Sequence, residues 1–130
     1  MSRIDDRVAA ARRDLERLTP EQARRAQAGG ALLIDTRTPW QRQTQGNLPN
    51  SLVIDRTVLE WRLDPTNDAH IPEATSDMKV IVICRHGYSS SLAARSLRDL
   101  GIDATDVIGG VDAWITDGLP VDAGPVDERR

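Results

Sequence analysis

Apolar residues gather in short continuous runs in the middle of the chain and recur every three or four positions in the segments around those runs. A continuous run of four or five apolar residues, bounded by turn residues, is typical of a strand buried on both faces of a parallel sheet. We therefore predict strands at residues 31–34, 51–54, 79–83 and 104–108, of which 79–83 is the clearest.

The first segment carries a helical pattern instead. Its apolar residues are separated by Arg and Asp and lie at Ile4, Val8, Ala11, Leu15 and Leu18. This spacing predicts an amphipathic helix over residues 1–18. The pattern leaves two interpretations open, because such a helix either packs on the rest of the protein or forms a solvated arm outside it.

Two later segments begin with the signature of a capping box, in which a hydroxyl and a glutamine satisfy backbone groups of the first helical turn. Thr19 and Gln22 form one such pair, and Thr38 and Gln41 form the other. A proline follows each threonine and suits the first turn. Glycines end these two helices, and further helices are predicted at residues 57–63, 90–100 and 111–117.

Strands that alternate with helices imply crossover connections, which predict an α/β fold with a parallel open sheet and helices on both faces. We expect one domain at 19–121, preceded by the N-terminal helix and followed by a polar tail at 122–130 that is disordered. Ligands of open sheets bind at the carboxyl ends of the strands. Cys84 lies at that end of one predicted strand, and Asp35 and Arg37 lie at that end of another.

The charge and composition of the chain limit the classes of partner that it can bind. The net charge is −3 and the isoelectric point is near 5.3, which argues against nucleic acid or an anionic membrane as the main partner. The first residues contain no long apolar stretch, so we predict neither a secretory signal nor a membrane-spanning helix. A single cysteine cannot form an internal disulfide, which fits the cytoplasm. Two histidines and one cysteine at no ligand spacing predict no metal site, and we expect no cofactor.

Cys84 is the strongest candidate for chemistry. It ends a run of β-branched residues and precedes a short loop containing Gly87, after which a helical pattern begins. Backbone N–H groups of such a loop and the positive end of the following helix both favour an anion, so they would stabilise a thiolate. The alternative is that Cys84 is a small apolar core residue. The glycine and the hydroxyl groups of the loop favour the reactive thiolate.

Four short motifs in the correct order resemble those of the rhodanese-like domain family. They are Asp35-Thr-Arg37 after a strand, Gly46-Asn-Leu-Pro-Asn-Ser51 before one, Cys84-Arg-His-Gly-Tyr-Ser-Ser90, and Gly109-Gly-Val-Asp-Ala-Trp114. The resemblance extends from about Thr19 to Val121. It implies a sulfurtransferase in which the cysteine takes the outer sulfur of a donor, such as thiosulfate or a persulfide. The cysteine then holds that sulfur as a persulfide and passes it to cyanide, a thiol or a protein.

Carried onto this chain, the resemblance makes Cys84 the catalytic nucleophile and persulfide carrier. Asp35 and Arg37 are interpreted as a supporting ion pair rather than as catalytic groups. For Ser90, capping of the following helix and contact with the substrate remain alternatives. His86 is either a base or substrate contact, or an exposed loop histidine. The residues expected to surround the substrate are Arg85, His86, Gly87, Tyr88, Ser89 and Ser90.

The chain departs from the family pattern at three positions. Ser89 stands where the loop of the family has an arginine, and Arg85 either compensates or points into solvent. Asn47 and Asn50 replace a histidine and a glycine; asparagine tolerates a left-handed backbone, so the turn is expected to persist. These departures leave the fold prediction unchanged and bear on the efficiency with small anionic donors such as thiosulfate.

The remaining polar and aromatic residues are given structural interpretations. The arginine pairs Arg12-Arg13 and Arg24-Arg25 are expected to form solvated helix faces, and His70 is expected to be a loop residue. The three tryptophans are expected to anchor the core, since the chain has no phenylalanine, and they are Trp40, Trp61 and Trp114.

Two other functions remain open. The domain could be a sulfur-relay or interaction module that accepts persulfide from a protein partner and has little turnover on small molecules. It could also be a cysteine-dependent phosphatase or arsenate reductase, since related loops bind phosphate. A phosphatase loop requires an arginine that clamps the phosphoryl oxygens, but Ser90 occupies that position here.

Overall fold

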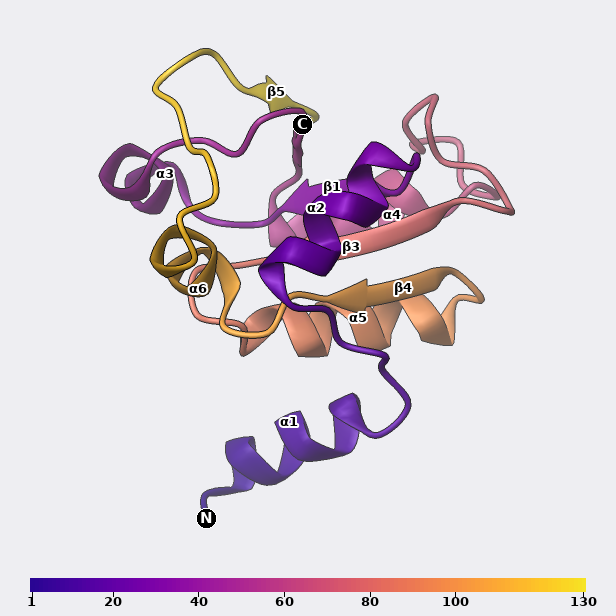
Figure 1. Cartoon of the computed structure of the whole chain (residues 1–130). Helices are drawn as coiled ribbons and strands as arrows, with labels where there is room; N and C mark the ends of the chain where they lie inside the picture. The colour runs from indigo at the N-terminus through magenta and orange to yellow at the C-terminus, as the bar shows by residue number, and fades with distance from the viewer.

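Five short parallel strands form a single sheet in the computed structural model, which describes residues 1–130 (Figure 1). The spatial order of the strands is β4-β3-β1-β2-β5. Their bounds are β1 (Leu32–Asp35), β2 (Leu52–Val53), β3 (Lys79–Ile83), β4 (Asp103–Asp106) and β5 (Asp127–Glu128). The predicted parallel α/β fold is therefore confirmed.

Helices connect the strands and start where the sequence predicts. The capping boxes at Thr19 and Thr38 are both formed. A third box, at Ser2, opens the first helix. None of the helices is both long and apolar enough to span a membrane. The helices are α1 (Arg3–Arg12), α2 (Pro20–Ala28), α3 (Pro39–Gln45), the 3₁₀ turn η1 (Arg56–Val58), α4 (Leu59–Leu63), α5 (Ser89–Asp99) and α6 (Gly110–Thr116).

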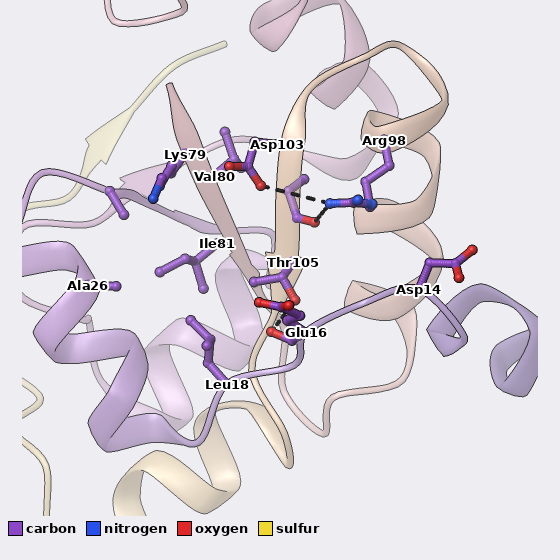
Figure 2. Close-up of a pocket in the computed structure, with 12 residues that line it drawn as sticks. Asp14, Glu16, Leu18, Ala26, Lys79, Val80, Ile81, Arg98, Asp103 and Thr105 are labelled. Atoms are coloured by element: carbon purple, nitrogen blue, oxygen red, sulfur yellow. Dashed lines mark hydrogen bonds and ion pairs between the residues drawn. The ribbon is translucent and has the colours of Figure 1, made fainter. Parts of the chain in front are cut away.

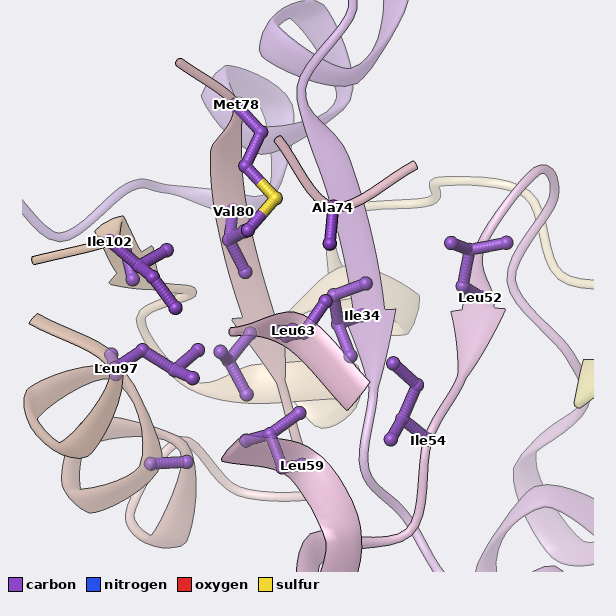
Figure 3. Packing of buried hydrophobic residues seen from close by; sticks show 14 of the residues in the cluster. Ile34, Leu52, Ile54, Leu59, Leu63, Ala74, Met78, Val80, Leu97 and Ile102 are labelled. Atoms are coloured by element: carbon purple, nitrogen blue, oxygen red, sulfur yellow. The ribbon is translucent and has the colours of Figure 1, made fainter. Parts of the chain in front are cut away.

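Each face of the sheet has its own hydrophobic core, as alternate side chains of buried strands require. On one face, Leu63 of α4 and Leu97 of α5 pack toward Ile34 and Val80 of the sheet (Figure 3). On the other face, Ala23 of α2 and Val111 and Trp114 of α6 pack against Leu33, Ile81 and Ile83. The prediction of helices on both faces is confirmed.

Trp114 is buried as expected, whereas Trp40 and Trp61 are exposed, so the prediction that they anchor the core is wrong.

The first helix is shorter than its apolar spacing suggests. It ends at Arg12, and the chain then runs to the edge of the sheet, where Leu18 forms a parallel bridge with Val107. Hydrogen bonds to this strand edge replace the last helical turns. Val8 and Ala11 are buried, and α1 packs on α5. The N-terminal helix is thus part of the folded protein and not a solvated arm.

The polar tail also differs from the prediction. It is not disordered but returns to the sheet, where β5 pairs with β2 and Asp122 bridges Asn47. The guanidinium of Arg129 donates to both carboxylate oxygens of Glu73 at 2.8 and 2.6 Å and also pairs with Asp127. Backbone pairing and ion pairs hold this segment, so its polar composition did not indicate that it joins the sheet.

We predict that β5 detaches when its ion pairs are lost. Hydrogen bonds from Arg129 hold the pKa of the Glu73 carboxyl below its ordinary value of 4.5. A carboxyl whose pKa is lower in the folded state stabilises that state above pH 4.5 and loses this effect as the pH falls through the lower value. Hydrogen-exchange protection of residues 127–129 should therefore drop in acid.

At neutral pH, the Arg129→Met variant should show the same loss of protection, by about fivefold. The matched control is Arg130→Met, because the side chain of Arg130 is 87% exposed and its ion pair with Glu128, at 3.4 Å, is open to solvent and contributes little. Equal protection of β5 in the two variants would contradict the prediction.

Candidate active site

Cys84 follows β3 directly, at the carboxyl edge of the sheet, and only 6% of it is exposed. The chain then forms a loop that leads into α5. The N–H groups of Gly87 and Ser90 donate to Sγ of Cys84, at 3.2 and 3.4 Å. Hydrogen bonds of this kind favour the charged form of their acceptor. The loop therefore presents its backbone to the sulfur atom in the way that stabilises a thiolate.

Gly87 permits the tight path of the loop. Its φ is +85°, in the left-handed region that residues with a side chain rarely adopt. A Cβ at this position would also lie 2.7 Å from the backbone nitrogen of Gly109. Both the backbone angle and the close approach exclude other residues.

The Gly109-Gly110 motif forms a platform on which this loop rests. The first amides of α6 donate to the loop, from Val111 to the Cys84 carbonyl at 2.9 Å and from Asp112 to the Arg85 carbonyl at 3.0 Å. A Cβ on Gly110 would lie 2.4 Å from the Cys84 carbonyl oxygen. The glycine therefore allows the start of α6 to approach the backbone of Cys84.

Asp106, at the end of β4, binds the first turn of α5. Its carboxylate is fully buried and accepts hydrogen bonds from the hydroxyls of Ser90 and Ser91, at 2.8 and 2.7 Å. It also pairs with Arg17 at 2.8 Å. This arrangement fixes the segment whose amide points at the sulfur of Cys84.

Ser90 therefore fills neither of its two expected roles in the way predicted. The helix begins at Ser89 with Tyr88 at the N-cap, and no side chain caps it. The Ser90 hydroxyl is fully buried on Asp106, so it does not face a substrate. The backbone N–H of Ser90 is the group that reaches Cys84.

The other loop side chains point outward. Ser89 and Tyr88 are exposed. His86 is half exposed, and its Nδ1 contacts the carboxylate of Asp112, which also accepts a hydrogen bond from Gln45 at 2.7 Å. Residues from α3, α6 and the loop after Cys84 thus meet at Asp112.

Arg85 neither reaches the sulfur nor extends into solvent. Its guanidinium lies over the ring of Trp40, 5.9 Å from the centroid. Its Nε is buried without a hydrogen-bond partner. Arg85 thus ties the loop to α3 through a cation–π contact.

Asp35 and Arg37 form a buried ion pair at the end of β1. The Arg37 guanidinium donates to both carboxylate oxygens of Asp35 and to the carbonyl of Gly46 at 2.9 Å. These contacts brace the segment after α3, consistent with a supporting role.

In the following turn, Asn50 has a φ of +59°, so asparagine does take the left-handed backbone in place of glycine.

Four residues that hold the loop were missed by the sequence analysis: Arg12, Arg17, Asp106 and Asp112. Asp106 is a charged residue inside a strand pattern, and Asp112 lies within the Gly-Gly motif, so each carried a weak local signal. Arg12 was interpreted as part of a solvated helix face, and this is wrong. Its side chain donates to Ser91 and to the Gly87 carbonyl.

A hollow of about 430 Å³ lies at the opposite end of the sheet (Figure 2). It surrounds the amino ends of β3 and β4, where Lys79 and Asp103 begin the two strands. Arg98 of α5 spans its rim to Asp103. Because Cys84 is at the other end of β3, this hollow does not belong to the cysteine site.

We predict that Gly110→Ala destabilises the protein more than the same substitution at a glycine with open space around it, and that it alone disturbs the site. The matched control is Gly101→Ala, because Gly101 also has a positive φ but has open space around its Cβ position. Both variants should lose about 1–2 kcal/mol of unfolding free energy from the backbone angle. Gly110→Ala should lose about 2 kcal/mol more, because the new methyl group pushes on the carbonyls of the loop.

Urea unfolding measures the stability part of this prediction. The rate of Cys84 alkylation by iodoacetamide measures the site, and it should change only in Gly110→Ala. Identical behaviour of the two variants would show that the platform does not position the loop.

Comparison with known proteins agrees with this geometry. The model of the rhodanese-like domain family matches residues 19–117. Thiosulfate sulfurtransferase GlpE of Pseudomonas syringae is 34% identical over 105 residues, which cover 79% of this chain and 90% of that protein. Adenylyltransferase and sulfurtransferase UBA4 of Candida albicans is 29% identical over 88% of this chain, which spans only 25% of that longer protein.

A solved structure is similar over almost the whole length. It is a protein of unknown function from Rhodopseudomonas palustris, described as a possible tyrosine phosphatase, with 28% identity and a TM-score of 0.84. The similarity covers 94% of this chain and 96% of the other. The match of the family model to most of the chain, together with the sulfurtransferase relative, shows that this protein belongs to the rhodanese-like domain family.

Proposed function

We propose that this protein is a rhodanese-type sulfurtransferase in which Cys84 carries a sulfane sulfur between a donor and a thiophilic acceptor. The observation that carries this proposal is the pair of backbone N–H groups, from Gly87 and Ser90, that converge on Sγ of Cys84. A sulfur atom held in this way is a stabilised nucleophile. The family relationship and the thiosulfate sulfurtransferase relative support the same conclusion.

The reaction divides into two displacements at sulfur. The Cys84 thiolate attacks the outer sulfur of the donor, and the electron pair of the broken bond leaves with sulfite or with a thiolate. The product is a Cys84 persulfide anion. Cyanide or an acceptor thiolate then attacks the outer sulfur of this persulfide, and the Cys84 thiolate is regenerated. Both steps move negative charge over the loop amides, which is the charge that oriented N–H groups stabilise.

The loop is better suited to a sulfur anion than to a phosphoryl group. Phosphoryl transfer from a cysteine loop needs a cation that clamps the phosphoryl oxygens. At the position of that cation, the chain has Ser90, whose hydroxyl is held by Asp106. Arg85, the cation within the loop, lies over Trp40 instead. The description of the Rhodopseudomonas palustris protein as a possible phosphatase keeps this activity as the alternative to test.

The donor and acceptor are proposed by class. Thiosulfate is the donor named for the GlpE relative, and a persulfide is the second candidate. A protein donor or acceptor is favoured by the UBA4 relative, in which a sulfurtransferase is part of a longer protein. Cys84 is the only thiol and is free, which suits a reducing compartment such as the cytoplasm.

We predict that Cys84 acquires one sulfur atom from a sulfane donor. Intact-mass spectrometry after incubation with thiosulfate, and separately with a polysulfide, should show a mass increase of one sulfur that a reductant removes. Protein first alkylated at Cys84 is the matched control and should show no increase. The same adduct in Cys84→Ser would contradict the proposal, and so would the absence of an adduct with every donor.

Steady-state assays should separate the three functions. We expect thiocyanate formation from thiosulfate and cyanide, with no hydrolysis of an aryl phosphate. Loading of Cys84 by a cysteine desulfurase without thiocyanate formation would identify a sulfur-relay module. Hydrolysis of the aryl phosphate that is lost in Cys84→Ser would identify a phosphatase and overturn the sulfurtransferase proposal.

A further inference from the structure

Two arginines from outside the loop converge on the carbonyl oxygen of Gly87. Nη2 of Arg12 donates to it at 2.7 Å, and Nη2 of Arg17 donates at 3.0 Å. The Ser91 hydroxyl lies 3.5 Å from the same oxygen. No other carbonyl of the loop is bound by two guanidinium groups. A neutral acceptor with two cationic donors is strongly polarised.

Both arginines precede the region that the family model matches, which begins at residue 19. Arg12 is the last residue of α1, which lies beyond α5 in Figure 1 and packs on it. The packing also includes the guanidinium of Arg95, which donates to the carbonyl of Ala11 at 3.1 Å. The N-terminal helix therefore places Arg12 against the back of the sulfur-binding loop.

The two arginines differ in whether a carboxylate compensates their positive charge. Arg17 forms an ion pair with the buried carboxylate of Asp106, so its charge is compensated. Arg12 has no carboxylate partner. Its remaining contacts are Nε with the Ser91 hydroxyl at 2.9 Å and the guanidinium with the ring of Tyr88, 5.6 Å from the centroid. Arg12 thus adds a positive charge beside the loop.

The arginines that bind the Gly87 carbonyl also set the direction of the Tyr88 N–H, because the two groups share one peptide. The carbonyl of Gly87 and the N–H of Tyr88 belong to one planar trans peptide, so they point in opposite directions. Because the arginines hold the carbonyl, the N–H of Tyr88 points away from Arg12 and Arg17. No group within the chain accepts a hydrogen bond from that N–H. It remains available for an anion on Cys84.

We propose that Arg12 is a positioning residue of the active site, which orients the Gly87–Tyr88 peptide so that the Tyr88 amide binds the outer sulfur of the Cys84 persulfide. The persulfide part of this proposal rests on the proposed function. The orientation of the loop and the added charge do not depend on it. In this arrangement, a cation supplied by the N-terminal helix supports the loop that lacks its arginine at Ser89.

The test compares Arg12→Met with Arg13→Met, because Arg13 is the adjacent, exposed arginine whose side chain forms no hydrogen bond or ion pair. Both variants lose one positive charge at the end of α1. Iodoacetamide alkylation of Cys84 at neutral pH should slow by about fivefold in Arg12→Met and remain unchanged in Arg13→Met. In the thiosulfate assay, kcat of Arg12→Met should fall by a similar factor with little change in KM, since Arg12 binds the Gly87 carbonyl and Ser91 rather than the sulfur of Cys84.

Thermal unfolding distinguishes this role from a tether for α1. A lower unfolding temperature of Arg12→Met with an unchanged alkylation rate would overturn the proposal. If Arg12→Met does not fold, Arg12→Lys and Arg13→Lys replace the pair. Lysine keeps the charge but cannot donate in a fork to both Ser91 and Gly87, so alkylation should slow by about twofold in Arg12→Lys alone.

Equal alkylation rates in the lysine pair would also overturn the positioning role. The alkylation measurement needs no sulfur donor. A failure of sulfur transfer in the unmodified protein would therefore count against the proposed function and not against the role of Arg12.

Discussion

Two N–H groups of the loop, those of Gly87 and Ser90, donate to Sγ of Cys84, and the surrounding structure supplies donors to three carbonyls of the same loop. Buried carbonyls without partners are costly, so each needs a donor. The first amides of α6 bind the carbonyls of Cys84 and Arg85. Arg12 and Arg17 bind the carbonyl of Gly87. The fold thus supports the loop with two separate parts of the chain, the start of α6 and the N-terminal segment.

This constraint explains why the structural motifs lie far apart in the sequence but close together in space. Gly110, the first residue of α6, is needed because a Cβ there would strike the carbonyls of Cys84 and Arg85. The buried carboxylate of Asp106 anchors Ser90, Ser91 and Arg17 together. Removal of one partner from such a buried charged group generally costs several kcal/mol, so the network is a rigid support rather than an adjustable one. A rigid support keeps the amides oriented before the substrate arrives.

The fold and the position of the candidate cysteine at the end of a strand could be predicted from the sequence because their signals are local. The run that ends at Cys84 and the capping box at Thr19 each lie within a few residues. The contacts that complete the site join residues far apart in the chain. Arg12 meets Gly87 across 75 positions, and no spacing rule separates it from Arg13 beside it. The tail was missed for a related reason, since β5 is held by backbone pairing and by Arg129 rather than by apolar side chains.

A crystal structure of the protein after reaction with thiosulfate would test the central claim most directly. The account predicts a second sulfur atom bonded to Sγ of Cys84, inside an unchanged loop, with the N–H of Tyr88 within hydrogen-bond distance of the new atom. The carbonyl of Gly87 should remain on Arg12 and Arg17. A sulfur atom that points away from the loop amides, or a loop that opens to release the Gly87 carbonyl, would contradict the account.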